Sequence, residues 1–271
     1  MDDFSGWIGR TRRAEDEVTR PALRRIAALL DMADTDFPDG GPVPPHWYAM
    51  FFPEIARQSE LGLDGHPRKG EFLPPVPLPR RMFAGRRMRF DGTLHVGDRA
   101  TKRSEIVAIT PKAGRSGAMV FVTIRHVISV ATAPVITEEQ DVVYRAAVRP
   151  EAPMAAPQPA PVEPTWQETV TPTPTLLFRY SAITFNGHRI HYDADYARDE
   201  EGYPGLVMNG GLTLLLLLQA AARATGRVPA GVSVRNVRPL FVGGTVTLAG
   251  AGNQAWAADA AGAVCVSADF V

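Results

Sequence analysis

The segment 184–193 reads TFNGHRIHYD and places two histidines shortly before a pair of glycines at 210 and 211. His191 could do acid–base chemistry, because an unperturbed imidazole pKa near 6.5 lets it take and return a proton at neutral pH. Gly210 and Gly211 open a very apolar stretch. Backbone N–H groups at a helix N-terminus can stabilise a thioester oxygen that gains negative charge, and glycine lets the thioester approach closely. The pattern predicts an active site where histidines meet a helix.

Other polar residues are weaker candidates. His188 suits a structural or hydrogen-bonding role at the substrate. Arg80 and Arg81 end a proline-stiffened segment, so one of them could hold a substrate carboxylate through two parallel hydrogen bonds, and both could equally be solvated. Asp193 is expected to cap or orient its neighbours. The six histidines are scattered along the chain, and no Cys/His/Asp spacing resembles a ligand set, so we expect no metal.

The leucine-rich stretch 212–218 must be enclosed by the rest of the protein, because a helix that is apolar all round cannot face water. It is too short for a membrane span, which needs about 20 apolar residues. Helical spacing predicts another helix at 15–33, and 49–63 could hold a short one. Prolines exclude a helix or central strand from 66–81. Alternating residues then predict strands at 82–91, 99–110, 118–131 and 135–147.

Residues 150–175 are rich in proline and alanine and are expected to be a linker. After it the plan repeats: a strand at 176–183, the leucine helix, and strands near 231–240, 245–257 and 263–271. LHVGD at 94–98 matches LFVGG at 240–244. The prediction is an α+β fold with an internal duplication, in which 1–149 forms one half and 176–271 the other.

Composition narrows the function. Lysine plus arginine equals aspartate plus glutamate, 29 of each, so no bulk charge favours nucleic acid or a membrane surface. A single cysteine, Cys265, excludes an internal disulfide and fits a reducing cytoplasm. No signal peptide is visible at the start. We therefore expect a cytoplasmic protein that acts on a small molecule.

The motif TFNGHRIHYD resembles the hydratase signature of the MaoC-like family, and most closely that of the 3-methylfumaryl-CoA (mesaconyl-C4-CoA) hydratases. The resemblance extends to GHPRKGEFLPPVPLPRRMFAG at 65–85, EEQDVVYR at 138–145 and EGYPGLV at 201–207. It implies a double hot dog, which is two antiparallel sheets each wrapped around a helix, with the catalytic motif in the second half. A homodimer of double hot dogs is compatible with it.

The resemblance also implies site residues. Family members use an Asp and a His five residues apart, and the matching pair here is Asn186 and His191. Asn209 and Gly211 stand where the family usually has the His and Pro of His-Gly-Pro, so we expect an altered site. Tyr203, within EGYPGLV, is a further candidate for substrate contact.

The implied activity is a cofactor-independent enoyl-thioester hydratase or dehydratase. Its substrate would be a short acyl group, which could be dicarboxylic, carried on coenzyme A or on an acyl carrier protein. Two alternatives stay open: a hot-dog thioesterase, and an acyl-thioester-binding protein without hydratase activity.

Overall fold

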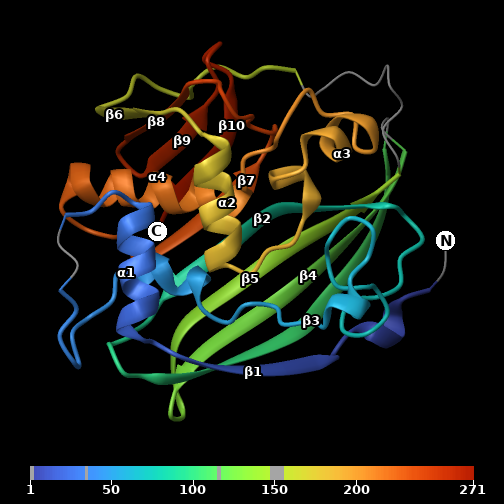
Figure 1. The fold of residues 1–271 in the computed structure, drawn as a ribbon, viewed down its shortest axis with the longest axis horizontal. Coiled ribbons are helices and arrows are strands. Elements are labelled where there is room, and N and C mark those ends of the chain that lie inside the picture. The colour runs from blue at the N-terminus through green and yellow to red at the C-terminus, as the bar shows by residue number, and fades with distance from the viewer. Residues whose placement is uncertain (1–2, 34–35, 115–116, 147–155) are drawn as a thin grey trace.

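Ten strands form one antiparallel sheet in the computed structural model, which describes residues 3–33, 36–114, 117–146 and 156–271 (Figure 1). Their order across the sheet is β1-β3-β4-β5-β2-β7-β10-β9-β8-β6. The strands are β1 (Thr11–Glu17), β2 (Arg80–Phe90), β3 (Arg99–Gly114), β4 (Gly117–Val130), β5 (Ala133–Arg145), β6 (Trp166–Val170), β7 (Gly231–Asn236), β8 (Val246–Ala251), β9 (Gln254–Ala258) and β10 (Val264–Phe270).

The sheet order reflects the predicted duplication. Strands β1 to β5 occupy one side, β6 to β10 occupy the other, and β2 pairs with β7 in the middle. That junction runs from Gly85 opposite Arg235 to Arg89 opposite Gly231. The matching segments 94–98 and 240–244 are the connections β2–β3 and β7–β8, which are equivalent places in the two halves.

Four α-helices accompany the sheet in the described ranges: α1 (Arg20–Leu29), α2 (Pro174–Ile183), α3 (Ala194–Asp199) and α4 (Gly210–Thr225). Short 3₁₀ helices occur at η1 (Ser5–Trp7), η2 (Pro45–Met50), η3 (Gln58–Glu60) and η4 (Arg189–His191). Helix α4 carries the predicted leucines, and Leu212, Leu217 and Leu218 are almost fully buried. It ends at Gly226, whose φ of 73° is the left-handed conformation that glycine adopts readily. No helix of the described residues combines the length and hydropathy that a membrane crossing requires.

The helix predicted at 15–33 is shorter than expected. Residues 15–17 belong to β1, where Glu15 pairs with Thr101 and Glu17 with Arg99. Helix α1 begins after Thr19, whose hydroxyl accepts a hydrogen bond from the Ala22 amide at 3.4 Å. The helical spacing is present from residue 20 onward, but residues 15–17 are extended because they pair with β3.

The strand predicted at 176–183 is wrong, because these residues form most of α2. Thr173 caps the helix by accepting from the Leu176 amide at 3.1 Å, and Pro174 occupies the first turn, where its fixed φ suits a helix. Leu177, Tyr180 and Ser181 make the buried face. Three- and four-residue spacing of this kind is helical.

Two other boundaries differ. Residues 166–170 of the predicted linker form the edge strand β6, which pairs with β8, while linker residues 150–155 lie outside the described ranges. The strand expected at 245–257 is two strands, β8 and β9, which pair with each other. The proposed limits of the two halves stay a prediction.

The two halves differ in their helices. In the described part of the first half, α1 is the one α-helix, so no counterpart of the long α4 appears there. The short helix expected at 49–63 is reduced to the end of η2 and to η3. Helix η2 packs against α4 instead, and its His46 Nε2 and Trp47 Nε1 lie 3.0 and 3.3 Å from Gln219 Oε1. The first half therefore helps to enclose the helix of the second.

Candidate active site

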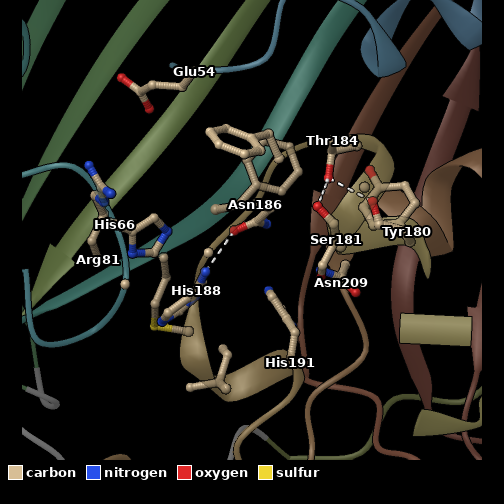
Figure 2. Close-up of a pocket in the computed structure, with 18 of the residues that line it drawn as sticks. Glu54, His66, Arg81, Tyr180, Ser181, Thr184, Asn186, His188, His191 and Asn209 are labelled. Carbon is tan, nitrogen blue, oxygen red and sulfur yellow. Dashed lines mark hydrogen bonds between the residues drawn. The ribbon is translucent and has the colours of Figure 1, made fainter. Parts of the chain in front are cut away.

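A cavity of about 950 Å³ lies between the two halves. Strands β2, β4 and β5, the loop 48–73, the segment 184–192 and the start of α4 contribute to its wall. The lining includes most of the site residues predicted from the sequence: Arg81, Asn186, His188, His191, Tyr203, Asn209, Gly210 and Gly211. Figure 2 shows several of these side chains around the shared space.

His191 is held in one tautomer at the end of η4. Its Nδ1 lies 2.7 Å from the carbonyl oxygen of Val207, and since a carbonyl only accepts, Nδ1 must carry the hydrogen. Nε2 is then left with a lone pair. Burial lowers the pKa of His191 to about 4, against the smaller opposing effect of the Val207 hydrogen bond. The ring is therefore neutral at pH 7 and can accept a proton through Nε2.

Asn186 and His188 belong to one tight turn. The Asn186 side-chain oxygen accepts a hydrogen bond from the His188 amide at 3.0 Å, which leaves its NH₂ group as a donor. Phe185 precedes them with a φ of 52°. His188 is buried, and its burial, followed by the charges of His66 and His191, lowers its pKa to about 2. His188 therefore stays neutral.

The start of α4 faces the same cavity. Asn209 precedes the first turn and donates to the Ser181 hydroxyl at 3.3 Å, while its buried oxygen has no hydrogen-bond partner among the described residues. The amides of Gly210 and Gly211 belong to the first turn, whose N–H groups have no partner within the helix. At Gly211 a Cβ would overlap the hydroxyl of Tyr180. Glycine at this position makes room for a tyrosine from α2.

The two candidate arginines have different surroundings. Arg80 turns toward Glu201 at 2.7 Å and toward the Tyr203 hydroxyl at 2.6 Å. Arg81 lines the cavity. Burial acts to raise the pKa of the Glu54 and Asp64 carboxyls, Arg12 and His66 are the main groups that lower it, and the charge of Arg81 adds a smaller lowering effect. Arg80 is thus already paired within the protein, and Arg81 is the one of the two that a ligand in the cavity could reach.

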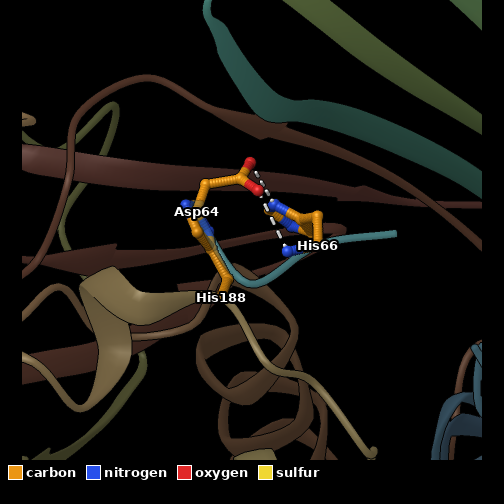
Figure 3. Close-up of side chains that lie close together, drawn as sticks. All are labelled: Asp64, His66 and His188. Carbon is orange, nitrogen blue, oxygen red and sulfur yellow. Dashed lines mark hydrogen bonds and ion pairs between the residues drawn. The ribbon is translucent and has the colours of Figure 1, made fainter. Parts of the chain in front are cut away.

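Sequence reasoning missed the contribution of the proline-rich loop. His66 lies beside His188, with ring centroids 4.1 Å apart, and His188 lies 5.3 Å from His191. Three of the six histidines, which are far apart or separate in the sequence, are therefore neighbours in the structure. Asp64 Oδ2 accepts from His66 Nδ1 at 2.9 Å (Figure 3). The motif GHPRKG was a signal for this loop, but nothing in the sequence linked it to residue 188.

Asp64, His66 and His188 are the described residues whose potential ligand atoms gather within 4.8 Å of one another. The side chains of Asp64 and His66 are already hydrogen-bonded to each other. We interpret the arrangement as a hydrogen-bonded Asp–His pair beside a neutral histidine.

A second polar group in the cavity wall comes from helix η2 and strands β2 and β5 of the first half. Glu138 accepts from the Tyr48 hydroxyl at 2.7 Å and pairs with Arg86 at 3.1 Å, and all three line the cavity. Burial acts to raise the pKa of the Glu138 carboxyl, but Arg86 and the other cations nearby hold it below its usual value. This part of the cavity wall is consequently polar and charged.

Comparison with known proteins identifies the family. Residues 46–242 match the model of hydroxyacyl-thioester dehydratase type 2. The chain belongs to this family. It is 46% identical over 242 residues to a mesaconyl-C(4)-CoA hydratase of Chloroflexus aurantiacus, with 88% of this chain and 85% of the relative covered. A mitochondrial hydroxyacyl-thioester dehydratase type 2 of Schizosaccharomyces pombe is 51% identical over 49 residues, which are 18% of this chain and 16% of the relative.

Solved structures confirm the fold class. HtdX of Mycobacterium tuberculosis superposes with a TM-score of 0.67 at 17% identity, over 96% of this chain and 98% of that one. A MaoC-like dehydratase from Phytophthora capsici superposes with a TM-score of 0.70 at 14% identity, over 97% of this chain and 95% of that one. Another M. tuberculosis protein, which is described as having a double hotdog fold, superposes with a TM-score of 0.59 at 15% identity, over 97% of this chain and 95% of that one. The predicted hot-dog architecture and the predicted class, an acyl-thioester hydratase or dehydratase, are confirmed.

Proposed function

We propose that this hydroxyacyl-thioester dehydratase family member adds or removes water across the double bond of a short dicarboxylic acyl-CoA. The observation that carries the proposal is the state of His191, a neutral imidazole whose Nε2 lone pair is free in a cavity beside the first turn of α4. The 46% identity to a mesaconyl-C(4)-CoA hydratase supports an acyl group with a second carboxylate.

In the hydration direction, His191 Nε2 takes a proton from water as the water oxygen attacks Cβ of the enoyl thioester. The NH₂ group of Asn186 donates to that oxygen and orients it. The electron pair of the double bond moves toward the thioester carbonyl, whose oxygen gains negative charge and accepts from the Gly210 amide at the positive end of α4. His191 then returns the proton that it took from water to Cα, so the product gains one hydroxyl and one hydrogen. Asn186 does not take part in this transfer, because an amide does not exchange a proton near neutral pH.

Arg81 is the proposed partner of the second carboxylate. It reaches the cavity from β2, and an arginine can hold a carboxylate through two parallel hydrogen bonds. Arg80 is not proposed for this role, because Glu201 and Tyr203 already occupy its guanidinium. Tyr203 lines the cavity, but its hydroxyl accepts from Arg80, so its proposed part is to shape the wall.

The test is an assay with crotonyl-CoA and with mesaconyl-CoA, in which the enoyl absorbance and the concentration of free thiol are both measured over time. Loss of absorbance without free thiol is the expected result and means hydration. Release of thiol would mean that the same amides and histidine direct water to the carbonyl, as in a thioesterase. Tight binding with neither change would make the chain a binding protein. The same acyl groups on an acyl carrier protein show which carrier is preferred.

A further inference from the structure

A tyrosine hydroxyl at the cavity has no partner within the protein. Tyr180 of α2 is 5% exposed and lines the cavity, but no hydrogen bond joins its hydroxyl to the described part of the chain. The hydroxyls of Tyr48, Tyr192 and Tyr203, the other tyrosines of the lining, each have a protein partner. Burying a hydroxyl without a hydrogen bond is unfavourable. A ligand in the cavity is therefore the expected partner of Tyr180.

This hydroxyl lies at the start of α4. A Cβ on Gly211 would overlap the Tyr180 hydroxyl oxygen, so that oxygen touches the Gly211 backbone. Cα–Cβ bonds in a helix tilt toward its N-terminus. The oxygen therefore lies on the N-terminal side of Gly211, where the first amides of the helix have no partner within it. Glycine admits the hydroxyl and also keeps an N–H group that a proline would lack.

The neighbours of Tyr180 hold it in this place. The Thr184 hydroxyl donates to the Tyr180 carbonyl at 2.9 Å near the end of α2. The next residue, Ser181, accepts from Asn209 at 3.3 Å, which ties α2 to the residue before α4. Figure 2 shows these residues together on one side of the cavity. The hydroxyl is thus positioned by the fold before a ligand enters, as effective stabilisation of a developing charge requires.

The Tyr180 hydroxyl keeps its hydrogen at neutral pH. Burial raises the pKa of Tyr180 to about 12, while the charge of Arg86 lowers it and that of Glu138 raises it. A neutral phenol donates a hydrogen bond but does not take a proton from water, so it cannot replace His191. Its donor hydrogen and the amides of α4 together suit one kind of ligand atom, an acceptor oxygen that gains negative charge.

We propose that Tyr180 is a catalytic residue whose hydroxyl donates a hydrogen bond to the thioester carbonyl oxygen, beside the Gly210 amide. The inference rests on the proposed hydration. As water adds its oxygen to Cβ and gives a proton to His191 Nε2, the π pair shifts toward the carbonyl oxygen and forms the enolate. The hydroxyl and the amide stabilise this oxygen. His191 then returns the proton to Cα, and Tyr180 keeps its own proton throughout.

Steady-state hydration of mesaconyl-CoA by Tyr180→Phe is the first test. This change keeps the ring and removes only the hydroxyl, so the fold should survive, which circular dichroism and thermal melting check. We expect kcat to fall about 10²- to 10³-fold, the usual effect of removing one donor to an oxyanion. KM should change little, because the hydrogen bond strengthens mainly as the enolate forms.

Tyr196→Phe is the matched control. Tyr196 lies on α3 outside the cavity lining, where it packs against a small apolar cluster that includes Ala197 and Val207. Its hydroxyl can be removed without a change at the site, so kcat and KM should keep their wild-type values.

A second measurement locates the hydrogen bond. In a His191→Ala background mesaconyl-CoA binds but is hydrated only slowly, so infrared difference spectroscopy with an isotope-labelled thioester carbonyl can follow the carbonyl stretching frequency. A hydrogen bond to the carbonyl oxygen lowers this frequency. Adding Tyr180→Phe to this background should therefore raise the frequency, and adding Tyr196→Phe should not.

Two results would overturn the inference. A folded Tyr180→Phe protein that keeps the wild-type kcat would show that the hydroxyl does not act in the reaction. An unchanged carbonyl frequency, even with a lower kcat, would place the hydroxyl away from the thioester oxygen. A wild type that hydrates neither mesaconyl-CoA nor crotonyl-CoA would instead remove the proposed function, and the carbonyl frequency would still test the contact with Tyr180.

Discussion

At the scale of single residues, the hydrogen bond between His191 and Val207 decides which nitrogen can react. It fixes the hydrogen on Nδ1, and burial keeps the other nitrogen unprotonated through the physiological range. The Asn186 side chain is also held in one orientation, because its oxygen accepts a hydrogen bond from the His188 amide. Its NH₂ group is therefore the part that remains to donate to water. In the proposed mechanism, this oriented amide takes the place of the carboxylate that the resemblance implies.

Replacing His191 with alanine should lower kcat for hydration about 10²- to 10⁴-fold, the usual contribution of a positioned acid–base group. The fold should survive, since the side chain lies at a cavity and not within α4. Steady-state rates and melting temperature check both parts. The companion change Asn186→Asp tests the amide: a faster Asp variant would show that Asn186 is a weakened form of the family's carboxylate. Full activity in a folded His191→Ala protein would exclude His191 from the mechanism.

Arg81→Met should raise KM for mesaconyl-CoA about tenfold or more and spare crotonyl-CoA, because a charge-assisted hydrogen bond contributes roughly 1.5–3 kcal/mol. Arg80→Met is the matched control. It removes the contacts with Glu201 and Tyr203 and should reduce stability without changing the ratio of the two KM values. If Arg81→Met affects both substrates equally, Arg81 binds the coenzyme A part or only supports the wall.

At the scale of elements, α2 and α4 are fitted to each other at the cavity. The resemblance implied an altered site, because Gly211 stands where the family usually has proline. The structure shows a physical reason for Gly211, which is that the Tyr180 hydroxyl occupies the place of a side chain. Introducing the proline by Gly211→Pro would therefore create an overlap, with or without Asn209→His.

Gly211→Ala should destabilise the protein, and adding Tyr180→Phe should recover much of the loss, because it removes the overlapping oxygen. Overpacking of this kind typically costs about 1–3 kcal/mol. Urea unfolding of the wild type, both single variants and the double variant measures the coupling. Strictly additive effects would mean that the helix shifts to accommodate the alanine.

Elements with a strong local pattern could be predicted from the sequence, and those decided by distant contacts could not. The alternation at 118–131 predicted β4, and the leucines predicted α4. The residues at 15–17 were predicted as part of a helix, but they form part of β1 because they pair with β3. Helix α2 was predicted as a strand, although Thr173 and Pro174 are typical of a helix start. The residues near His191 were predictable from their motif. His66 was not, because its approach to His188 depends on one glycine meeting another more than a hundred residues away.

At the scale of the whole molecule, the interior is rich in neutral histidine. Burial lowers the pKa of His46, His126 and His191 to about 4 each and that of His188 to about 2. His46 and His126 lie in the first half, and His188 and His191 lie in the second. Protonation of these four side chains therefore affects the stability of both halves. Cytoplasmic location and assembly into a homodimer stay predictions.

Stability should fall as the pH drops from about 6.5 toward 4. In that window the unfolded chain binds protons that the folded protein does not, so acid favours unfolding. Each pKa unit of depression corresponds to about 1.4 kcal/mol for each histidine. Urea midpoints at pH 7.5, 6 and 5 measure the trend, with exposed His95→Gln as a control that should not change the slope. A midpoint constant from pH 7.5 to 5 would contradict it.

The pairing of β2 with β7 has a consequence during synthesis. Strand β2 ends at residue 90 and its partner begins at 231, so on the ribosome β2 must wait as an open edge on the order of ten seconds at 5–20 residues per second. Open edges recruit other chains, and charged side chains discourage this. The strand reads RRMFAGRRMRF, with five arginines. We therefore expect the charge of this strand to discourage aggregation of the nascent first half until the second half covers its edge.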